Sequence, residues 1–501
     1  MSAKKLNLKD KYRLLTRDLD WDFSYEDRKD AFPFEEFEGI KITDWDKWED
    51  PFRLTMDSYW KYQAEKEKKL YAIYDAFSQN NGHLNVSDAR YVNAIKIFLT
   101  AVSPGELAAH SGFAFTGRQM GGIGARIASQ MQSIDELRHI QTQIHAMSHY
   151  NKFFDGFDEF SHMHDRVWYI SVVKSFFDDA RSAGPFEFMV SVGFSFEYVL
   201  TNLLFVPFMS GAAYNGDMAT VTFGFSAQSD EARHMTLGLE IIKFLLEQHE
   251  DNVPIVQKWI DKWLWRGYRI LTVVAMMMDY MLPQKVMSWK EAWELYFEQA
   301  GGALFKDLER YGIKMPDYTD LIKAEKDHLS HQAWWTFYTN SQATAFHTWI
   351  PSDEELDWLS EKYPETFDKY YRPRWELAKE MADKGERYYN EGLPQLCQTC
   401  QIPMIYTDVQ NDPRDIVYRS TKYQGERFHF CSDQCQHIFE DEPEKYVHAW
   451  LPVHQIFQGN CGGPGGLEKV MDYYKLDVGN ANMDYVGSPD EERWKNWKGV
   501  A

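Results

Sequence analysis

The chain has 501 residues, enough for about three average domains or for one large domain with appendages. Its apolar content of 44%, with 33 Phe, 29 Tyr and 18 Trp, excludes a disordered chain and allows a large core. The formal net charge of −22 would repel a phosphate backbone, so no nucleic-acid partner is expected.

Residues 1–55 are predicted to form an N-terminal arm. The segment is rich in Asp, Trp and Phe but lacks clear helical periodicity, so its large side chains need a surface that covers them. That surface is either the rest of this chain or another subunit. The first residues show no apolar stretch typical of a secretory signal, and we expect a reducing cytoplasm.

Residues 56–390 are predicted to be helical almost throughout, because apolar residues recur at spacings of three and four. Helices are expected at roughly 87–118, 122–150, 164–181, 186–213, 218–249, 253–282, 289–312, 319–342 and 354–389. Breaks are expected at Ser103-Pro104-Gly105, Ala183-Gly184-Pro185, Asn215-Gly216-Asp217 and Leu282-Pro283. No alternating pattern predicts a large sheet here, so the fold class is mainly α.

One apolar stretch, residues 188–213, raises the question of a membrane. It carries Glu197 and Asn202 near its centre, and Pro207 follows them. A carboxylate at the middle of a bilayer is costly, whereas a helix buried in a large soluble core has the same apolar profile. We therefore expect a buried helix and no membrane partner.

Residues 391–450 are predicted to form a small module with β-hairpin content, because Gly, Pro, Cys and short Tyr, Val and Phe runs replace the helical pattern. Residues 451–501 are expected to be a tail of loop with one short helix.

Four of the five cysteines lie in this module. Cys397-x-x-Cys400 and Cys431-x-x-x-Cys435 have the spacing of paired loops that hold tetrahedral zinc with four thiolates, so one structural zinc ion is predicted. A disulfide pair and an iron–sulfur or redox role are the alternatives. Cys461 is left over and is expected to be a free thiol.

A repeated motif is the most informative feature of the sequence. Residues 135–139 read Asp-Glu-Leu-Arg-His, and residues 230–234 read Asp-Glu-Ala-Arg-His. Glu136 and His139, like Glu231 and His234, are three residues apart, so on a helix each pair lies on one face. Each pair can then reach one metal.

A further glutamate in apolar surroundings precedes each motif: Glu106 before the first and Glu197 before the second. Two Glu helices and two Glu-x-x-His helices supply the ligand set of a carboxylate-bridged dimetal bundle, a ferritin-like architecture. Four buried glutamates without metal would be strongly disfavoured, and two divalent ions balance their charge. Oxygen and imidazole ligands favour iron or manganese.

The residues beside these ligands have a supporting role. A ligating His usually donates its other N–H to a carboxylate, which is the role expected of Asp135 and Asp230. Arg138 and Arg233 can neutralise those aspartates, although plain surface ion pairs are the alternative for both arginines.

With Gly-Glu-Leu at 105–107 and Phe-Glu-Tyr-Val-Leu-Thr-Asn at 196–202, the paired motifs resemble the hydroxylase α subunit of bacterial multicomponent (soluble di-iron) monooxygenases. The large oxygenase subunit of phenol hydroxylases is closest in appearance. The resemblance covers essentially the whole chain, including the cysteine module.

The resemblance implies roles for individual residues. One iron would take Glu106, Glu136 and His139, and the other Glu197, Glu231 and His234, with Glu136 as a bridge. Thr201 would deliver protons to iron-bound oxygen; a bond to its own helix carbonyl is the alternative. Asn202 and Gln228 would line a route for protons and electrons on the face that meets an effector protein.

The walls of an apolar substrate pocket would include Val102, Gly105, Ala109, Phe176, Val192, Phe196 and Phe205, any of which can equally be plain core.

The implied activity is hydroxylation of phenol or methylphenols to catechols with O2 at two iron ions. Gly121-Gly-Ile-Gly lacks a preceding strand and the full glycine pattern, so this chain is expected to bind neither flavin nor NAD, and NAD(P)H would act through a separate iron–sulfur flavoprotein reductase. Smaller β and γ subunits in a dimer of heterotrimers and a small cofactorless regulatory protein are the other implied partners.

Three alternatives stay open at this point: a toluene or arene monooxygenase of the same family, a radical-generating reductase subunit with the same ligand scheme, and a ferritin-like iron store. A stable tyrosyl radical would identify the second, and many iron atoms per assembly the third.

Two other histidine pairs, His145 with His149 and His162 with His164, could bind metal. They also resemble the histidine boxes of membrane desaturases, a class that needs several transmembrane spans. We expect them to be surface or interface histidines.

Overall fold

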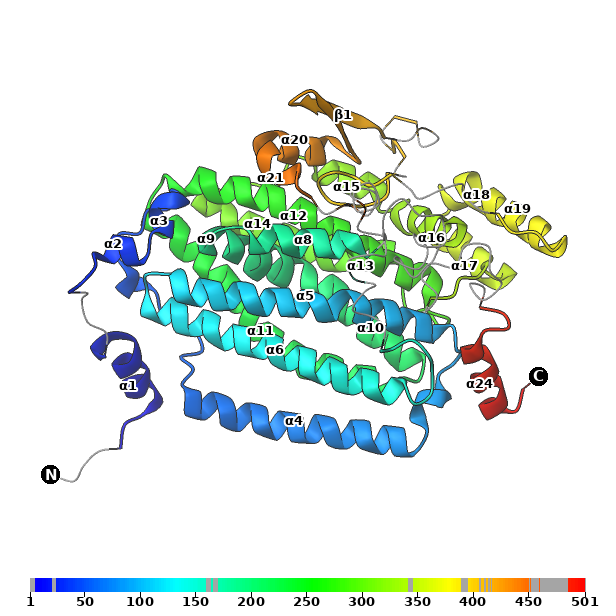
Figure 1. Cartoon of the computed structure of the whole chain (residues 1–501), viewed down its shortest axis with the longest axis horizontal. Helices are drawn as coiled ribbons and strands as arrows, with labels where there is room; N and C mark the ends of the chain where they lie inside the picture. Colours follow the sequence, from blue (N-terminus) through cyan, green and yellow to red (C-terminus); the bar gives the residue numbers. More distant parts are fainter. Residues whose placement is uncertain are drawn as a thin grey trace.

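Long helices from the middle of the chain pack side by side and make up the body of the molecule (Figure 1). The computed structural model describes residues 5–19, 24–158, 164, 170–340, 346–388, 395–404, 407–409, 411–412, 415, 417–449, 451, 459 and 485–500. The long helices are α4 (Met56–Gln79), α5 (Tyr91–Gln119), α6 (Ile123–Tyr150), α8 (Ser171–Arg181), α11 (Met218–Gln248) and α12 (Asn252–Met276). The mainly α fold class expected from the sequence is confirmed.

Shorter elements surround this body. Before it come α1 (Leu8–Arg13), η1 (Leu14–Asp18), α2 (Arg28–Ala31), α3 (Phe34–Phe37) and η2 (Trp45–Lys47), with η3 (Gly82–Asn85) between α4 and α5. After α12 come η5 (Met277–Met281), α13 (Trp289–Trp293), η6 (Glu294–Gln299), α14 (Ala300–Leu308), η7 (Glu309–Tyr311), α15 (Thr319–Glu325), α16 (Leu329–Thr339), α17 (Asp353–Lys362), α18 (Phe367–Tyr370) and α19 (Arg372–Asp383). The two helices predicted at 319–342 and 354–389 are therefore divided, the second beside Pro364 and Pro373, which cannot donate a helix hydrogen bond.

The positions of α4 and α5 in the bundle follow from their sequences. In α4 only Tyr59, Gln63, Leu70 and Tyr74 are buried, a single stripe that covers the bundle from outside. In α5 most residues are buried on every side, as expected for a helix at the centre of a large protein. α5 packs along α6 over much of its length (Figure 1).

The break expected at Ser103-Pro104-Gly105 is wrong, because α5 continues through Pro104. The other three expected breaks do separate helices. Proline removes one helix hydrogen bond, but α5 is packed against α6 and α8 around this point, and that burial keeps the helix intact. Glu106 is consequently held on a rigid helix.

The long apolar stretch forms one helical run made of α9 (Pro185–Phe188), η4 (Met189–Leu200) and α10 (Thr201–Tyr214). Among the described helices this run alone has the length and composition of a membrane span, and most of its apolar window is buried inside the fold. η4 is a π-helix, a wider turn that the periodicity did not predict and that often occurs at functional sites. Glu197 lies within it.

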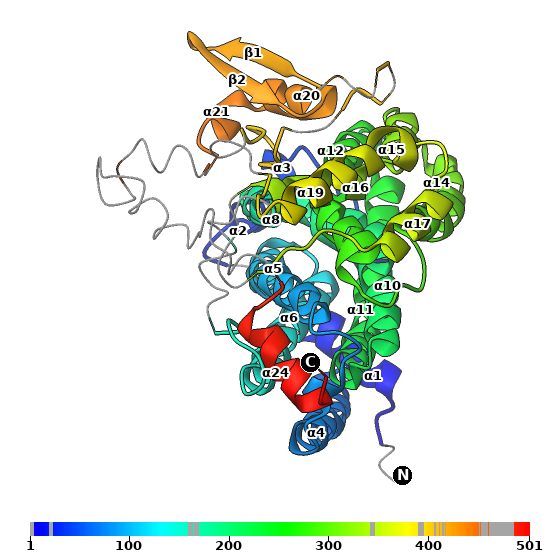
Figure 2. The same cartoon turned by 90° about the vertical axis from the view of Figure 1, so that its right-hand side faces the viewer.

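The cysteine module lies on one side of the bundle (Figure 2). It contains the antiparallel hairpin of β1 (Arg419–Tyr423) and β2 (Glu426–Phe430), then α20 (Asp433–Asp441) and α21 (Pro443–Tyr446). Side chains of α12 attach it to the bundle: Trp265 Nε1 donates to Cys435 Sγ at 3.2 Å, Arg266 donates to the Thr399 carbonyl at 2.7 Å, and Lys262 donates to Glu442 at 2.9 Å.

The N-terminal arm packs on its own chain. The Trp45 ring lies 6.2 Å from the ring of Phe186 and 5.3 Å from that of Phe244. Gly121 and Gly122 have no room for a β-carbon because Trp45, together with Glu35 at Gly121, occupies that space, so both glycines have a role in packing the arm. At the other end of the chain, α24 (Pro489–Lys498) is attached by a buried ion pair between Asp490 and Lys96. The division into an arm, a helical domain, a cysteine module and a tail stays a prediction.

Candidate dinuclear metal centre

Four helices bring together the six side chains that the two motifs and the preceding glutamates single out. They are Glu106 on α5, Glu136 and His139 on α6, Glu197 on η4, and Glu231 and His234 on α11. All six are buried, and none exposes more than 9% of its surface. The residues lie up to 128 positions apart in sequence, so only the packing of the bundle makes them neighbours.

The first half of the centre gathers around His139. Its Nδ1 lies 3.4 Å from Glu106 Oε2, 3.5 Å from Glu136 Oε2 and 3.7 Å from Glu231 Oε1. Three carboxylates therefore face one ring nitrogen.

The second half repeats this arrangement around His234. Its Nδ1 lies 3.3 Å from Glu136 Oε1, 3.3 Å from Glu197 Oε2 and 3.4 Å from Glu231 Oε2. Glu136 and Glu231 thus direct one oxygen to each histidine, and the two imidazole centroids are 6.0 Å apart. This geometry suits two metal ions with two carboxylates between them.

The two aspartates of the motifs support the histidines crosswise. His234 Nε2 lies 3.3 Å from Asp135 Oδ2, and His139 Nε2 lies 3.3 Å from Asp230 Oδ2. A carboxylate that accepts the Nε2 proton fixes the tautomer in which Nδ1 is free to bind a metal.

Arginines neutralise these buried aspartates. Arg138 donates to Asp135 at 3.0 Å and lies 3.4 Å from Asp230, and Arg233 pairs with Asp135. Both guanidiniums lie mostly inside the fold rather than at the surface, so the alternative of plain surface ion pairs does not describe them.

Helix α4 contributes a layer of polar residues that the sequence analysis missed. Tyr59 Oη donates to Asp135 at 2.6 Å, and Gln63 Nε2 donates to Asp135 at 2.9 Å and to Asp230 at 2.7 Å. Lys66 pairs with Asp230. Tyr59, Gln63 and Lys66 are spaced four and three residues apart, so their side chains lie on one face of α4. Polar residues on the face of a helix that packs against the bundle are the sequence pattern that could have identified them.

Two glutamines hold the outer carboxylates. Gln132 Nε2 donates to Glu197 Oε1 at 2.9 Å and to Glu136 Oε1 at 3.2 Å, and Gln143 Nε2 donates to Glu106 Oε1 at 3.2 Å. Both glutamines lie on α6, one turn from a ligand candidate, and were also missed.

The donor set fits a pair of metal ions. In the described part of the chain, the buried Nδ1 atoms of His139 and His234 have no hydrogen-bond partner although carboxylate oxygens surround them. Burial raises the pKa of Glu106 to about 8, and burial together with the charges of Glu136 and Glu231 raises the pKa of Glu197 well above its usual range. Cations at this point would offset the cost of four buried carboxylates.

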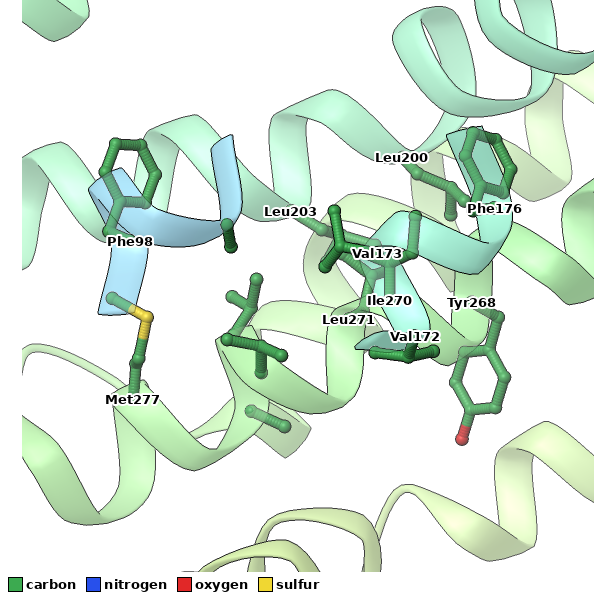
Figure 3. Packing of buried hydrophobic residues seen from close by; sticks show 14 of the residues in the cluster. Phe98, Val172, Val173, Phe176, Leu200, Leu203, Tyr268, Ile270, Leu271 and Met277 are labelled. Atoms are coloured by element: carbon green, nitrogen blue, oxygen red, sulfur yellow. The ribbon is translucent and has the colours of Figure 1, made fainter. Parts of the chain in front are cut away.

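An apolar cavity lies directly against the carboxylates. Its walls include Val102, Gly105, Ala109, Val192, Phe196 and Phe205, and Glu106, Glu136, Glu197 and Glu231 form one end. Phe98 of α5, Val173 of α8, and Ile270 and Met277 of the continuous run of α12 and η5 also line the apolar side (Figure 3).

Phe176, which was also expected in the wall, is not among the described residues that line the cavity. Phe176 is fully buried and packs against Trp263, with ring centroids 5.4 Å apart, whereas its neighbour Phe177 lines the cavity. The reason is rotation along α8, since consecutive helical residues point about 100° apart and sequence similarity alone does not fix which of two adjacent Phe faces inward.

Thr201 makes the bond to its own helix that was one of the two alternatives for it, and its expected role in proton delivery stays a prediction. Its Oγ1 donates to the Phe196 carbonyl at 3.2 Å, five residues earlier in the π-helix, and the residue also lines the cavity. Asn202 and Gln228 are half-buried on α10 and α11 and are not among the described residues that line the cavity.

The four module cysteines converge in a buried cluster. Cys431 Sγ lies 3.6 Å from Cys400 Sγ and 3.6 Å from Cys435 Sγ, and ligand atoms of all four residues lie within 4.8 Å of one another. Disulfide sulfurs would be about 2 Å apart, whereas sulfurs around tetrahedral zinc lie about 3.8 Å apart when Zn–S is about 2.3 Å. The cluster therefore fits zinc. Cys461 lies outside the described residues.

The fold and the site together define a class: a helical bundle whose buried Glu and His side chains fit an iron site. Sequence comparison assigns the family. The methane/phenol/alkene hydroxylase pattern matches residues 21–249, and the YHS domain pattern matches residues 411–450. The oxygenase component DmpN of phenol 2-monooxygenase from Pseudomonas sp. strain CF600 is 70% identical over 99% of this chain and 96% of its own length. The chain belongs to the methane/phenol/alkene hydroxylase family, which confirms the resemblance and the expected enzyme class, a monooxygenase.

Two further comparisons support the assignment. The crystal structure of phenol hydroxylase from Pseudomonas sp. OX1 superimposes with a TM-score of 0.94 at 70% identity and covers 98% of this chain and all of that one. The α subunit of the alkene monooxygenase oxygenase component from Xanthobacter autotrophicus is 29% identical over 94% of both chains.

Proposed function

We propose that the chain is the oxygenase subunit of a multicomponent phenol hydroxylase, which uses O2 and two iron ions to hydroxylate phenol or methylphenols to catechols. The observation that carries this proposal is the apolar cavity that ends on four glutamates. Such a cavity binds an aromatic ring and excludes water from the reacting atoms. The phenol 2-monooxygenase named above, 70% identical, supports the phenolic substrate.

One iron is assigned to Glu106, Glu136 and His139, and the other to Glu197, Glu231 and His234. Glu136 and Glu231 each direct one carboxylate oxygen to His139 and the other to His234, so both glutamates are candidates to bridge the two irons. Iron held there would supply the redox chemistry that activates O2.

The chain's own residues prepare this reaction in three ways. Asp135 and Asp230 hold the histidine Nε2 protons, which keeps both Nδ1 atoms available. Phe177, Phe196 and Phe205 keep the cavity dry. Thr201 places a hydroxyl at the cavity wall, from which a proton can be exchanged with a group bound inside.

Electrons and regulation are assigned to partner proteins: an iron–sulfur flavoprotein reductase that uses NAD(P)H, a small cofactorless regulatory protein, and β and γ subunits in a dimer of heterotrimers. Tyr214, Met218 and Phe225 are at least half exposed on α10 and α11, the helices that carry Asn202 and Gln228. Exposed apolar side chains in one region are typical of a protein interface. We assign this face to the regulatory protein.

The cysteine cluster is assigned one structural zinc ion, which would hold the hairpin and α20 together. Four buried thiols that bind zinc must stay reduced, which supports a cytoplasmic location.

Metal analysis with Mössbauer spectroscopy of the purified complex tests this function. Two coupled irons and one cysteine-bound zinc per chain are expected, with catechol formed from phenol when the reductase and regulatory protein are added. Glu231→Ala should abolish turnover and leave zinc unchanged. A protein with one iron or none, many irons per assembly, a stable tyrosyl radical, or turnover of toluene but not phenol would contradict the proposal.

A further inference from the structure

Helices α4 and α6 meet a second time, away from the dinuclear centre, and metal-ligating side chains gather there. His145 and His149 are one turn apart on α6, and Asp75 reaches them from α4. Ligand atoms of the three residues all lie within 4.8 Å of one another. His145 and His149 are therefore not isolated surface residues, and they do not belong to the dinuclear centre that contains His139.

The distances match those between ligands of one metal ion. His145 Nε2 lies 3.2 Å from His149 Nε2, and His149 Nε2 lies 3.4 Å from Asp75 Oδ1. With a Zn–N distance of about 2.05 Å, two nitrogens on a tetrahedral zinc ion lie about 3.3 Å apart. A carboxylate and two imidazoles with this separation fill three positions of a tetrahedron.

The surroundings hold the two rings in place and leave one side open. The His145 ring packs edge-on against Tyr71, with centroids 4.6 Å apart, and the buried His149 ring packs 4.7 Å from that of His145. Asp75 exposes 56% of its side chain, so water can reach the fourth position. Lys152 Nζ, 3.4 Å from His149 Nδ1, is the nearby cation, and it faces the ring nitrogen that would not bind the metal.

The ionisation of His149 is compatible with this role. Burial, then the charge of Lys152, lowers the pKa of its imidazole, so the ring is neutral near pH 7. A neutral imidazole is the form that binds a metal ion.

We propose that Asp75, His145 and His149 form a further metal site, which takes a divalent cation of the zinc type and keeps one position open to water.

The site joins the C-terminal half of α4 to α6. α4 also carries Tyr59, Gln63 and Lys66, which hold Asp135 and Asp230 behind the dinuclear centre. An ion bound between the two helices therefore clamps the helix that supports the iron ligands. This inference does not depend on the substrate.

Equilibrium dialysis of the assembled hydroxylase, already loaded with iron and with its cysteine-bound zinc, tests the site with buffered Zn²⁺ as the probe. We expect one additional zinc per chain. Asp75→Asn and His145→Ala should each weaken its binding by about tenfold or more, at least as much as the loss of an outer hydrogen-bond partner does. Glu65→Gln, an equal charge change at an exposed position of α4, should bind zinc like the parent protein.

A spectroscopic measurement identifies the ligands independently. Cu²⁺ bound at the site should show electron paramagnetic resonance splitting from two nitrogens in the parent, and from one in His145→Ala. No additional zinc, or additional zinc whose affinity is unchanged in both variants, would overturn the proposal. Asp75 is exposed, so its variant should fold, which an unchanged Tm would verify.

Discussion

Asp135 and His234 belong to different copies of the repeated motif, yet their side chains are in contact, with Asp135 Oδ2 3.3 Å from His234 Nε2. Asp230 and His139 make the reciprocal contact at the same distance. Each copy therefore supplies a histidine to its own half of the centre and an aspartate to the other half. Neither copy can build its half alone.

Asp135→Asn should weaken metal binding at the half that contains His234 more than at the other half. The amide cannot supply the same negative charge to the Nε2 proton, and loss of such a partner usually costs about 10–100-fold in metal affinity. Iron per chain and the two Mössbauer components would measure this. Asp230→Asn should affect the opposite component, and Glu240→Gln, a partly exposed residue of α11, should affect neither.

Gly238→Ala should disrupt the centre through the backbone. A β-carbon on Gly238 of α11 would overlap the carbonyl oxygen of Gly193 in η4. Gly238 lies one turn after His234 and Gly193 one turn before Glu197, so this close approach sets how near the two ligand helices can come. We expect a loss of about 1–3 kcal/mol in the free energy of unfolding, as for overpacking, together with reduced iron content.

Gly302→Ala is the matched control for this change. Nothing lies within 4 Å of a β-carbon on Gly302, which is also helical. Alanine is favoured over glycine in a helix by about 1 kcal/mol, so this variant should be as stable as the parent or more so. Equal Tm values and iron contents for the two glycine variants would contradict the argument.

Phe177→Leu and Phe176→Leu should separate substrate selection from core packing. Phe177 lines the cavity, so the smaller side chain should raise kcat/KM for dimethylphenols relative to phenol. Phe176 packs against Trp263 behind the wall, so its variant should lower Tm and leave the substrate ratio near that of the parent. The opposite result would place Phe176 at the substrate.

Asp279 should make stability depend on pH. Burial raises the pKa of this carboxyl group to about 6, although Tyr363 Oη and the Trp289 N–H donate to it. The folded-state pKa of Asp279 lies above the unfolded value of about 3.9. The contribution of this carboxyl group to the free energy of unfolding is therefore largest below about pH 3.9, and it is lost as the pH rises through 6.

Asp279→Asn removes this titration. The pKa of Asp279 affects stability between about pH 3.9 and pH 6, and about one pH unit of this window lies above pH 5. Each unit is worth about 1.4 kcal/mol, so between pH 5 and pH 8 the variant should gain about 1.4 kcal/mol in the free energy of unfolding relative to the parent. Tm values of both proteins across this range would measure the gain. A constant difference in Tm would show that the carboxyl group does not titrate there.

The helical fold and the family could be predicted from the sequence because both depend on local spacing. Apolar residues at three and four positions give helices whatever lies around them, and Glu and His three apart share a helix face. The same reasoning expected a break at Pro104, where burial of α5 against α6 and α8 prevails over the local preference of proline. It also missed the π-helix around Glu197, since η4 is apolar and buried almost throughout and so has no amphipathic pattern that an extra residue could shift.

The sequence by itself determined which residue types could bind metal: two Glu-x-x-His pairs, two more glutamates and two cysteine pairs. Only the tertiary structure decided which of them meet. It paired Asp135 with His234, turned Phe177 rather than Phe176 into the cavity, and brought Asp75 to His145 and His149. The physical reason is that these contacts join helices far apart in the chain, and the rotation and spacing of packed helices depend on all of their neighbours.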